Sequence, residues 1–487
     1  QGGQVVLRKV AGVENPPAIR QMQWAVLLLA LLPTSLTFTS DDYDQLSTLQ
    51  VVRALPDGEE LEEPKVEKPE PTAEPPTAEP PKVEPPTAEP PKAEPPKAEA
   101  LKAEVWPDKV KRFPGRKTLY PLPAAIQTHE LAVVPYAHDN DTGVNVLVSQ
   151  QSNSRLNFVH FPGDIGIATY TSSYVIGTDT SGLHGLSVSQ VMKDILLVTL
   201  QFDSAVAWLD VSRGALHKPE VKKTAYIPLP AAGPHRTTEV GHDVWVTCKG
   251  IASVVRIKGA YKRIGGKHGR WNFSKGEDNF VTYLVKQNPV FVEGANGFIF
   301  ATIDMNSAIV RINPNLGPDQ PEAVTYFDVP ADIGSTPVGM IKGYSNCYPG
   351  KAGGEVLWFV LAGGDGGGTG VFGKITGESR IHYFNTSAPF LSTAGYLHLA
   401  WAPCTGEGYP MLLLLASSTA YPSPPLRNPD GVATVSLDPD YSKILSQSFE
   451  FQPLQASMLH RIVASEHTYF VDGLKVSSLQ ATTTVKP

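Results

Sequence analysis

Short runs of alternating apolar and polar residues fill the chain after Arg112, and glycines, prolines and polar turns separate them. A period of two over runs of this length is typical of β-strands. Nothing after Arg112 shows the amphipathic pattern of a helix of about 12 residues or more. The pattern therefore predicts an all-β domain over residues 113–487, a length sufficient for one large domain.

These strands belong to a unit that recurs seven times between Leu119 and Leu479. Each unit reads as an outer Tyr-x-Leu-Pro-like strand, a loop, an inner x-His-x-apolar strand, and two further strands joined by a polar turn. Equivalent positions lie about 48 to 62 residues apart, a period that suits a four-stranded propeller blade. We therefore predict a seven-bladed β-propeller.

The seam of this ring is predicted by a segment that stands out of order. KTLYPLP (117–123) matches the outer strands but precedes the first blade, whereas the seventh blade has no outer strand after it. We expect residues 117–122 to supply that missing strand and to close the ring.

One position of the repeat carries candidate chemistry, because equivalent positions in a propeller fall on one ring around the central channel. Valine stands there in the fourth and fifth blades, and histidine in the other five: His129, His184, His235, His398 and His460. Imidazoles titrate near neutral pH and can move protons. Two other interpretations stay open: hydrogen bonds to a neighbouring blade, and a three-histidine site for Zn²⁺, although no HExxH spacing supports the latter.

Residues 1–112 have a different composition. Met22 opens an apolar run, Trp24–Leu32, that is too short to span a bilayer but fits a signal peptide, so we interpret 1–39 as leader and signal peptide. A membrane anchor is the alternative. Residues 40–112 contain a five-residue repeat, EPPTA, EPPKV or EPPKA, which predicts a disordered, extended polyproline stalk. Such a stalk suits a spacer towards a cell wall or matrix, unless the repeat is an unselected expansion.

Three sequons, at Asn140, Asn272 and Asn385, fall in expected turns or loops and suit a secreted, extracellular glycoprotein. The formal net charge of −7 and the pI near 6.0 do not favour nucleic acid as a partner, and no apolar run of membrane-spanning length occurs. After signal removal we therefore expect no membrane partner, and a glycan or other small extracellular ligand instead.

The three cysteines suggest one disulfide. Cys347 and Cys404 lie in equivalent loops of neighbouring blades, so we predict that they pair. Cys248 ends a strand and is expected to be a buried apolar group rather than a nucleophile.

The repeat resembles the streptogramin B lyase (virginiamycin B lyase-like) family over about residues 119–480. IPLPAAGPHRTTEVGHDVWVTCKGIASVVRI (227–257) is the best match, and GLHGLSVS, VLWFVL and AIVRINP match in part. The resemblance implies a seven-bladed propeller that opens a lactone by elimination with Mg²⁺, histidine and glutamate. The family's glutamate position holds Gln150, Leu200, Cys248, Ile303 and Leu361 here, which puts that metal site in doubt. Secreted fungal rhamnose–glucuronate lyases, also seven-bladed propellers that act by β-elimination, look similar.

These resemblances suggest a C–O lyase that works by β-elimination in the central cavity, on a uronate-containing glycan such as a rhamnose–glucuronate cap rather than on a lactone peptide. We assign the proton-transfer pair to His184 and His235, and substrate contacts to five further residues: His129, Arg236, Lys249, His398 and His460. The expected cofactor is a divalent cation, Mg²⁺ or Ca²⁺, or none. The alternatives are streptogramin B lyase-like ring opening and a non-catalytic binding propeller on an extracellular stalk.

Overall fold

The computed structural model describes residues 115–484 apart from short gaps. These gaps are 124–126, 136–142, 163–167, 169, 193–194, 212–220, 222, 265–269, 274–278, 305–306, 349–354, 364–366, 378–379, 389–390, 404–408, 419–429, 453–457 and 475. The expected leader and signal peptide (1–39) and the expected stalk (40–112) lie outside the described residues. Within the described residues, no helix is long and apolar enough to cross a membrane.

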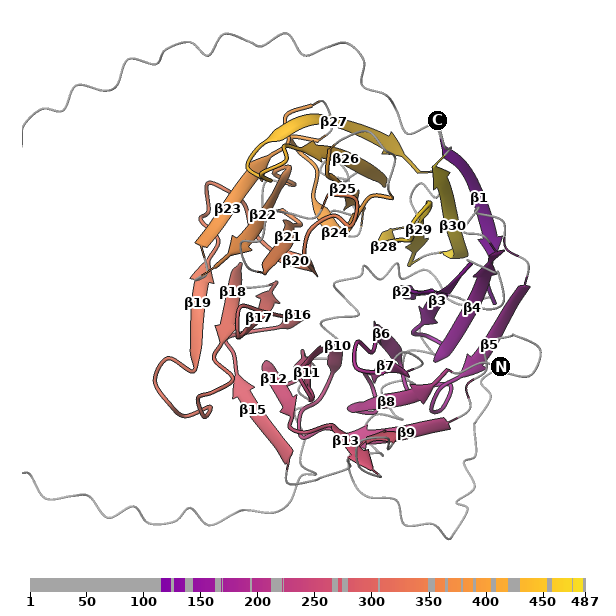
Figure 1. Cartoon of the computed structure of the whole chain (residues 1–487), viewed down its shortest axis with the longest axis vertical. Coiled ribbons are helices and arrows are strands. Elements are labelled where there is room, and N and C mark those ends of the chain that lie inside the picture. Colours follow the sequence, from indigo (N-terminus) through magenta and orange to yellow (C-terminus); the bar gives the residue numbers. More distant parts are fainter. Residues whose placement is uncertain are drawn as a thin grey trace, which may run out of the picture. The chain divides into compact units, whose positions relative to one another are not determined.

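Seven four-stranded antiparallel sheets form a ring, which confirms the predicted seven-bladed β-propeller (Figure 1). The strands of blades 1 to 4 are, in sheet order, β2 (Thr128–Pro135), β3 (Val144–Gln150), β4 (Arg155–Phe161), β5 (Tyr170–Val175); β6 (Leu183–Val188), β7 (Ile195–Leu200), β8 (Ala205–Asp210), β9 (Lys223–Pro228); β10 (Pro234–Val240), β11 (Asp243–Cys248), β12 (Ser253–Ile257), β15 (Phe280–Leu284); and β16 (Pro289–Ala295), β17 (Phe298–Ile303), β18 (Ala308–Ile312), β19 (Val324–Asp328). Those of blades 5 to 7 are β20 (Pro337–Lys342), β21 (Val356–Leu361), β22 (Val371–Thr376), β23 (Arg380–Asn385); β24 (Tyr396–Trp401), β25 (Met411–Ala416), β26 (Gly431–Leu437), β27 (Ile444–Phe451); and β28 (Leu459–Ala464), β29 (Thr468–Gly473), β30 (Val476–Thr484), β1 (Gly115–Pro121).

The seam of the ring lies in blade 7, as predicted. β1 pairs antiparallel with β30, from Gly115 opposite Thr484 to Pro121 opposite Ser478. The outer strand of the last blade thus comes from the start of the domain, and the edge of β30 is covered.

The hydrophobic core lies between the blades. Six of the seven clusters of buried side chains combine residues of two neighbouring blades, and the cluster of blades 4 and 5 also includes Leu397 of blade 6. The alternation of apolar and polar positions supplies both faces of each blade for this packing. Trp208, Trp245 and Trp358 are buried in these clusters, so their rings do not form a sugar-binding platform.

One element was not predicted. Between β12 and β15, blade 3 carries a separate two-stranded hairpin of β13 (Tyr261–Ile264) and β14 (Arg270–Phe273). Asn272, expected in a loop, lies on β14, and Asn385 is an exposed residue at the end of β23. The loop placement of these two sequons was therefore wrong; the third, Asn140, lies outside the described residues.

Candidate functional site

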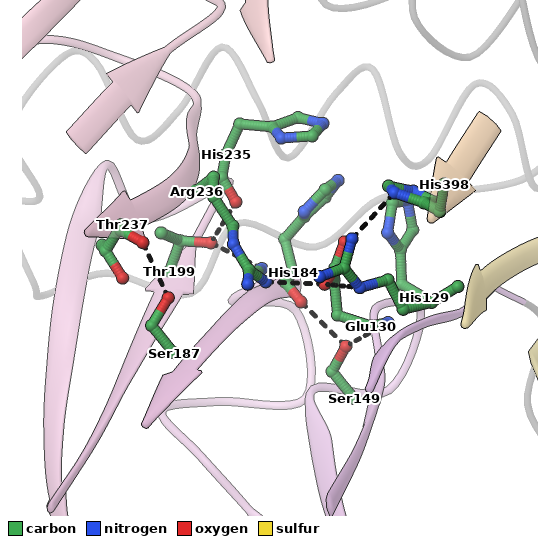
Figure 2. A network of polar contacts seen from close by, with 12 residues as sticks. His129, Glu130, Ser149, His184, Ser187, Thr199, His235, Arg236, Thr237 and His398 are labelled. Carbon is green, nitrogen blue, oxygen red and sulfur yellow. Dashed lines mark hydrogen bonds and ion pairs between the residues drawn. The ribbon is translucent and has the colours of Figure 1, made fainter. Parts of the chain in front are cut away.

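A β-bulge occurs in every inner strand at the place of the repeated histidine. The pairing register shifts at Thr128/Leu131, Leu183/Leu186, Pro234/Thr237, Pro289/Phe291, Pro337/Met340, Tyr396/His398 and Leu459/Ile462. A bulge locally breaks the strict alternation of side chains and re-aims them. In blade 1, for example, His129 and the next residue, Glu130, both lie in the central polar network (Figure 2).

The five histidines form an arc across blades 6, 7, 1, 2 and 3. Ring centroids are 5.3 Å apart for His398–His460, 3.9 Å for His460–His129, 3.7 Å for His129–His184 and 4.1 Å for His184–His235. Four of the rings belong to buried residues, and His129 is partly exposed. The structure thus brings together all five sequence-predicted histidines.

Three charged residues lie beside this arc. The Arg236 Nη1 atom is 2.7 Å, and the Arg461 Nε atom 3.4 Å, from Oε2 of Glu130, which is 1% exposed. Both guanidinium groups also lie over the ring of Phe291, 5.3 and 5.1 Å from its centroid. Two cations therefore share one carboxylate, so this Arg–Glu–Arg group taken by itself has a net positive charge. The carboxyl groups of Glu293 and Asp472, whose pKa values burial raises, also interact with these arginines.

A belt of hydroxyl groups holds the bulges in place. Each of these side chains accepts a hydrogen bond from a bulge N–H of its own blade, at 2.7–3.2 Å, and donates one to a carbonyl of the next blade, at 2.8–3.2 Å: Ser149, Thr199, Thr247 and Thr302. In blade 7, Oδ1 of Asp472 instead accepts from the N–H of Arg461 at 2.7 Å. Adjacent blades are thereby fixed to one another around the site (Figure 2).

Four of the five imidazoles are held in their neutral form. Burial is the largest cause that lowers the pKa of His129, His184, His235 and His398 well below the usual value. Neighbouring histidines, Lys249 and Arg461 lower these pKa values further by charge repulsion. Burial also lowers the pKa of Arg461, to about 10, which leaves its guanidinium charged at neutral pH.

The depressed histidine pKa values predict loss of stability in acid. Because the unfolded chain binds these protons more readily, the stabilisation is complete above about pH 6.5 and is lost as the pH falls towards the folded-state pKa values. Each such histidine then costs up to about 1.4 kcal/mol per pH unit. Burial raises the pKa values of Asp472 and Glu293, which opposes this trend at lower pH.

Urea unfolding of the full chain between about pH 5 and 8 measures this dependence. A His184→Gln variant should show a shallower decline below about pH 6.5, whereas His382→Gln, on the exposed face of β23, should not. Equal slopes for wild type and His184→Gln would contradict the assignment.

Other predicted residues are placed as follows. The Nζ atom of Lys249, just after β11, is 3.8 Å from a carboxylate oxygen of Asp304 and close enough to His235 to lower its pKa. Cys248 is a buried free thiol whose pKa burial raises to about 12, as expected of a non-nucleophilic cysteine. Cys347 is disulfide-bonded, and Cys404, its predicted partner, lies outside the described residues.

Among the residues that the structure describes, one group of side chains approaches closely enough to share a metal ion: His129, Glu130 and His460, whose ligand atoms lie within 4.8 Å of one another. Its donor atoms do not fit the expected Mg²⁺ or Ca²⁺, which prefer shells of oxygen ligands. Glu130, its single carboxylate, is already neutralised by two arginines, and their charges would repel a cation.

The sequence reasoning missed Glu130 and Arg461, which complete the charged group. A signal for them was present: both directly follow a repeat histidine, as Arg236 does. In the other four blades the residue after the repeat position is apolar or small (Gly185, Phe291, Gly339 and Leu399), so one acidic and two basic residues at this position stand out.

Comparison with known proteins extends the fold assignment. No family model and no curated protein matches the chain. The selenomethionine form of virginiamycin B lyase from Staphylococcus aureus superposes with a TM-score of 0.51 at 15% identity, over 76% of this chain and 100% of that one. A catalytically inactive histidine-to-alanine variant of the same enzyme, with quinupristin, gives 0.50 at 16% identity and the same coverage. Identities this low show a shared propeller fold only.

Proposed function

We propose that this protein is a C–O lyase that acts by β-elimination on an acidic substrate, a uronate-containing glycan such as a rhamnose–glucuronate cap. The observation that supports it is the juxtaposition of neutral imidazoles with a net cationic Arg–Glu–Arg group. Elimination next to a carboxylate needs a base for the α-proton and positive charge to stabilise the enolate-like intermediate.

The proposed reaction uses these groups as follows. A neutral imidazole, His184 or His235, takes the proton α to the substrate carboxylate. The C–H electron pair becomes the new C=C bond, and the C–O bond at the β carbon breaks with its electron pair on oxygen. The departing oxygen receives the proton that the imidazole pair has taken up, so both rings end neutral. Because the rings of His184 and His235 are 4.1 Å apart, a sugar cannot lie between them, so both act from one side of the substrate.

Positive charge near the base comes from two sources. Lys249 lies close enough to His129, His184 and His235 to influence all three, and Arg236 carries part of the charge that Glu130 leaves uncompensated. A carboxylate is the substrate group that best matches a guanidinium. The choice of an extracellular glycan rests on the signal-like segment and the sequons. A lactone peptide offers no such carboxylate, so streptogramin B lyase-like ring opening is the weaker form of the proposal.

The test is an elimination assay of the full chain on glucuronate-bearing glycans and a streptogramin B lactone, with and without chelator. A conjugated C=C product absorbs in the ultraviolet and is identified by mass spectrometry. His235→Ala is expected to lower kcat/KM by about 10²–10⁴-fold, because it removes a proton-transfer group. His382→Ala, on an outer strand, is the matched control and should retain activity. Full activity in a folded His184→Ala/His235→Ala double variant would overturn the proposal.

A non-catalytic binding propeller is the second candidate, and the burial of the histidines favours it. Four of the five belong to buried residues, and the hydroxyl belt bonds the backbone carbonyls of His184 and His235. Calorimetric binding of a glycan that never yields product, together with retained binding in His235→Ala, would select this alternative.

A further inference from the structure

We infer that Arg461 fixes the tautomer of His398, so that the proton of this imidazole sits on Nε2, whereas His460 carries its proton on Nδ1. The five histidines would then not be equivalent: Nδ1 of His398 accepts a hydrogen bond from Arg461, whereas Nδ1–H of His460 donates one to a backbone carbonyl. The tautomer assignment stands on geometry alone. Only the catalytic role drawn from it rests on the proposed elimination.

The hydrogen bond to His398 can run in one direction only. The Nη1 atom of Arg461 is 2.8 Å from Nδ1 of His398, and a guanidinium has donors but no acceptor. Nδ1 of His398 must therefore accept, and the neutral ring keeps its proton on Nε2. Burial is the main cause that lowers the pKa of His398, and the charge of Arg461 adds to it, so the doubly protonated ring is disfavoured.

Arg461 is itself held in place for this task. Its Nε atom is 3.4 Å from Oε2 of Glu130, its backbone N–H donates to Oδ1 of Asp472 at 2.7 Å, and its guanidinium lies 5.1 Å from the centroid of Phe291. Its side chain is 6% exposed. Residues of blades 1, 4 and 7 thus hold the guanidinium of Arg461 in position to donate to His398.

His460 shows the opposite arrangement. Its Nδ1 bonds the backbone carbonyl of His129 in the next blade, and a carbonyl can only accept, so Nδ1 carries a proton. Carbonyls of the next blade also favour the protonated forms of His184 and His235, through His235 and Val290 respectively. His398 differs from His460 because Arg461 occupies its Nδ1.

The neighbouring blade leaves room for this exception. A Cβ atom at Gly339, which takes the place of Glu130 in blade 5, would lie 2.7 Å from Nδ1 of His398. It would also lie 2.7 Å from the carbonyl oxygen of Leu397 and 2.8 Å from the Cα atom of His398, so a side chain there would shift this part of β24 together with the ring. His398 lies at one end of the arc of rings, and His184 and His235 lie towards its other end.

In the proposed elimination this makes His398 a neutral hydrogen-bond donor to oxygen that gains negative charge, with Arg461 as its positioning residue. A donor aimed at developing charge accelerates reactions by about 10²–10³-fold. A ring that stays neutral can donate without first acquiring a proton, because its Nε2–H is fixed in advance.

The test is a long-range ¹H–¹⁵N spectrum of the full chain labelled with ¹⁵N-histidine, at neutral pH, with His398→Gln and His460→Gln assigning the signals. We expect His398 to show a protonated Nε2 with a bare Nδ1, and His460 to show a protonated Nδ1. In Arg461→Met the His398 pattern should change, in Arg461→Lys it should be partly retained, and the signals of the exposed His382 should stay constant in both.

A protonated Nδ1 on His398 in the wild-type protein would overturn the inference, even if neither Arg461 variant folds. So would a His398 pattern unchanged in a folded Arg461→Met variant. If the tautomers are as stated but no substrate is eliminated, the proposed function fails and the tautomer assignment stands. If elimination occurs but His398 is protonated on Nδ1, the tautomer assignment fails and the proposed function stands.

Discussion

Removal of residues 1–125 is expected to abolish stable folding of the propeller, whereas removal of residues 1–112 should leave its stability unchanged. The first deletion takes away β1, which pairs with β30 over Gly115–Pro121 and Ser478–Thr484. It exposes the edge of β30 from Ser478 to Thr484, and an open edge of that length invites pairing with other chains.

The loss also reaches the core between blades 7 and 1. Leu122 belongs to the buried cluster there, and the Tyr120 ring packs against Phe161 with centroids 5.1 Å apart. The Nζ atom of Lys117 bonds the carbonyl of Phe451 at 3.0 Å. Burial of two such large side chains contributes about 3–6 kcal/mol, a large part of the roughly 5–15 kcal/mol that stabilises a typical domain.

Thermal unfolding followed by circular dichroism, with sedimentation analysis for aggregation, compares the two deletions. A peptide of residues 113–125 added to the longer deletion should restore part of the transition, because it supplies the missing strand. A cooperative transition at the wild-type temperature in the longer deletion would show that β1 does not close the ring.

The phase of the repeat was enough to predict the ring, its seam and the convergence of the five histidines. Each blade repeats the same period, and a closed ring converts equal positions in sequence into neighbours in space. The KTLYPLP segment indicated the position of the seam because it matched the outer strand that the last blade lacked. These features depend on the local pattern of strands and on closure of the ring of blades, and both can be predicted from a single sequence.

The hairpin of β13 and β14 could not be predicted in this way. Its two strands have four residues each and interrupt one blade only, so no other repeat supports them. The contacts of Glu130 were hidden for a different reason. They join blades 1, 3 and 7, and Arg236 is 106 residues away in the chain. They also depend on the bulges, which shift the side-chain register and so break the alternation on which strand predictions rest.

Replacement of Glu130 by glutamine is expected to lower the free energy of unfolding by about 3–5 kcal/mol. Glutamine has nearly the same shape but no charge, so Arg236 and Arg461, whose side chains are 12% and 6% exposed, would lose the carboxylate that both of them contact. Removing one member of a buried ionic group costs far more than the group contributes as a whole, because the remaining charges lose their compensation in a medium of low polarity.

Two variants make this prediction specific. Glu355→Gln removes the carboxylate of an exposed pair, 2.5 Å from Lys342, and should cost about 0–1 kcal/mol. The triple variant Glu130→Gln/Arg236→Met/Arg461→Met removes the charges together and should recover most of the lost stability. Urea unfolding of the full chain measures all three.

A Glu130→Gln midpoint equal to that of the wild type would mean that the two arginines are solvated or paired elsewhere, and that the cationic group next to the histidines is not built as a buried triad. Recovery in the triple variant, accompanied by loss of elimination activity, would instead show that the group is retained for its charge and at the expense of stability.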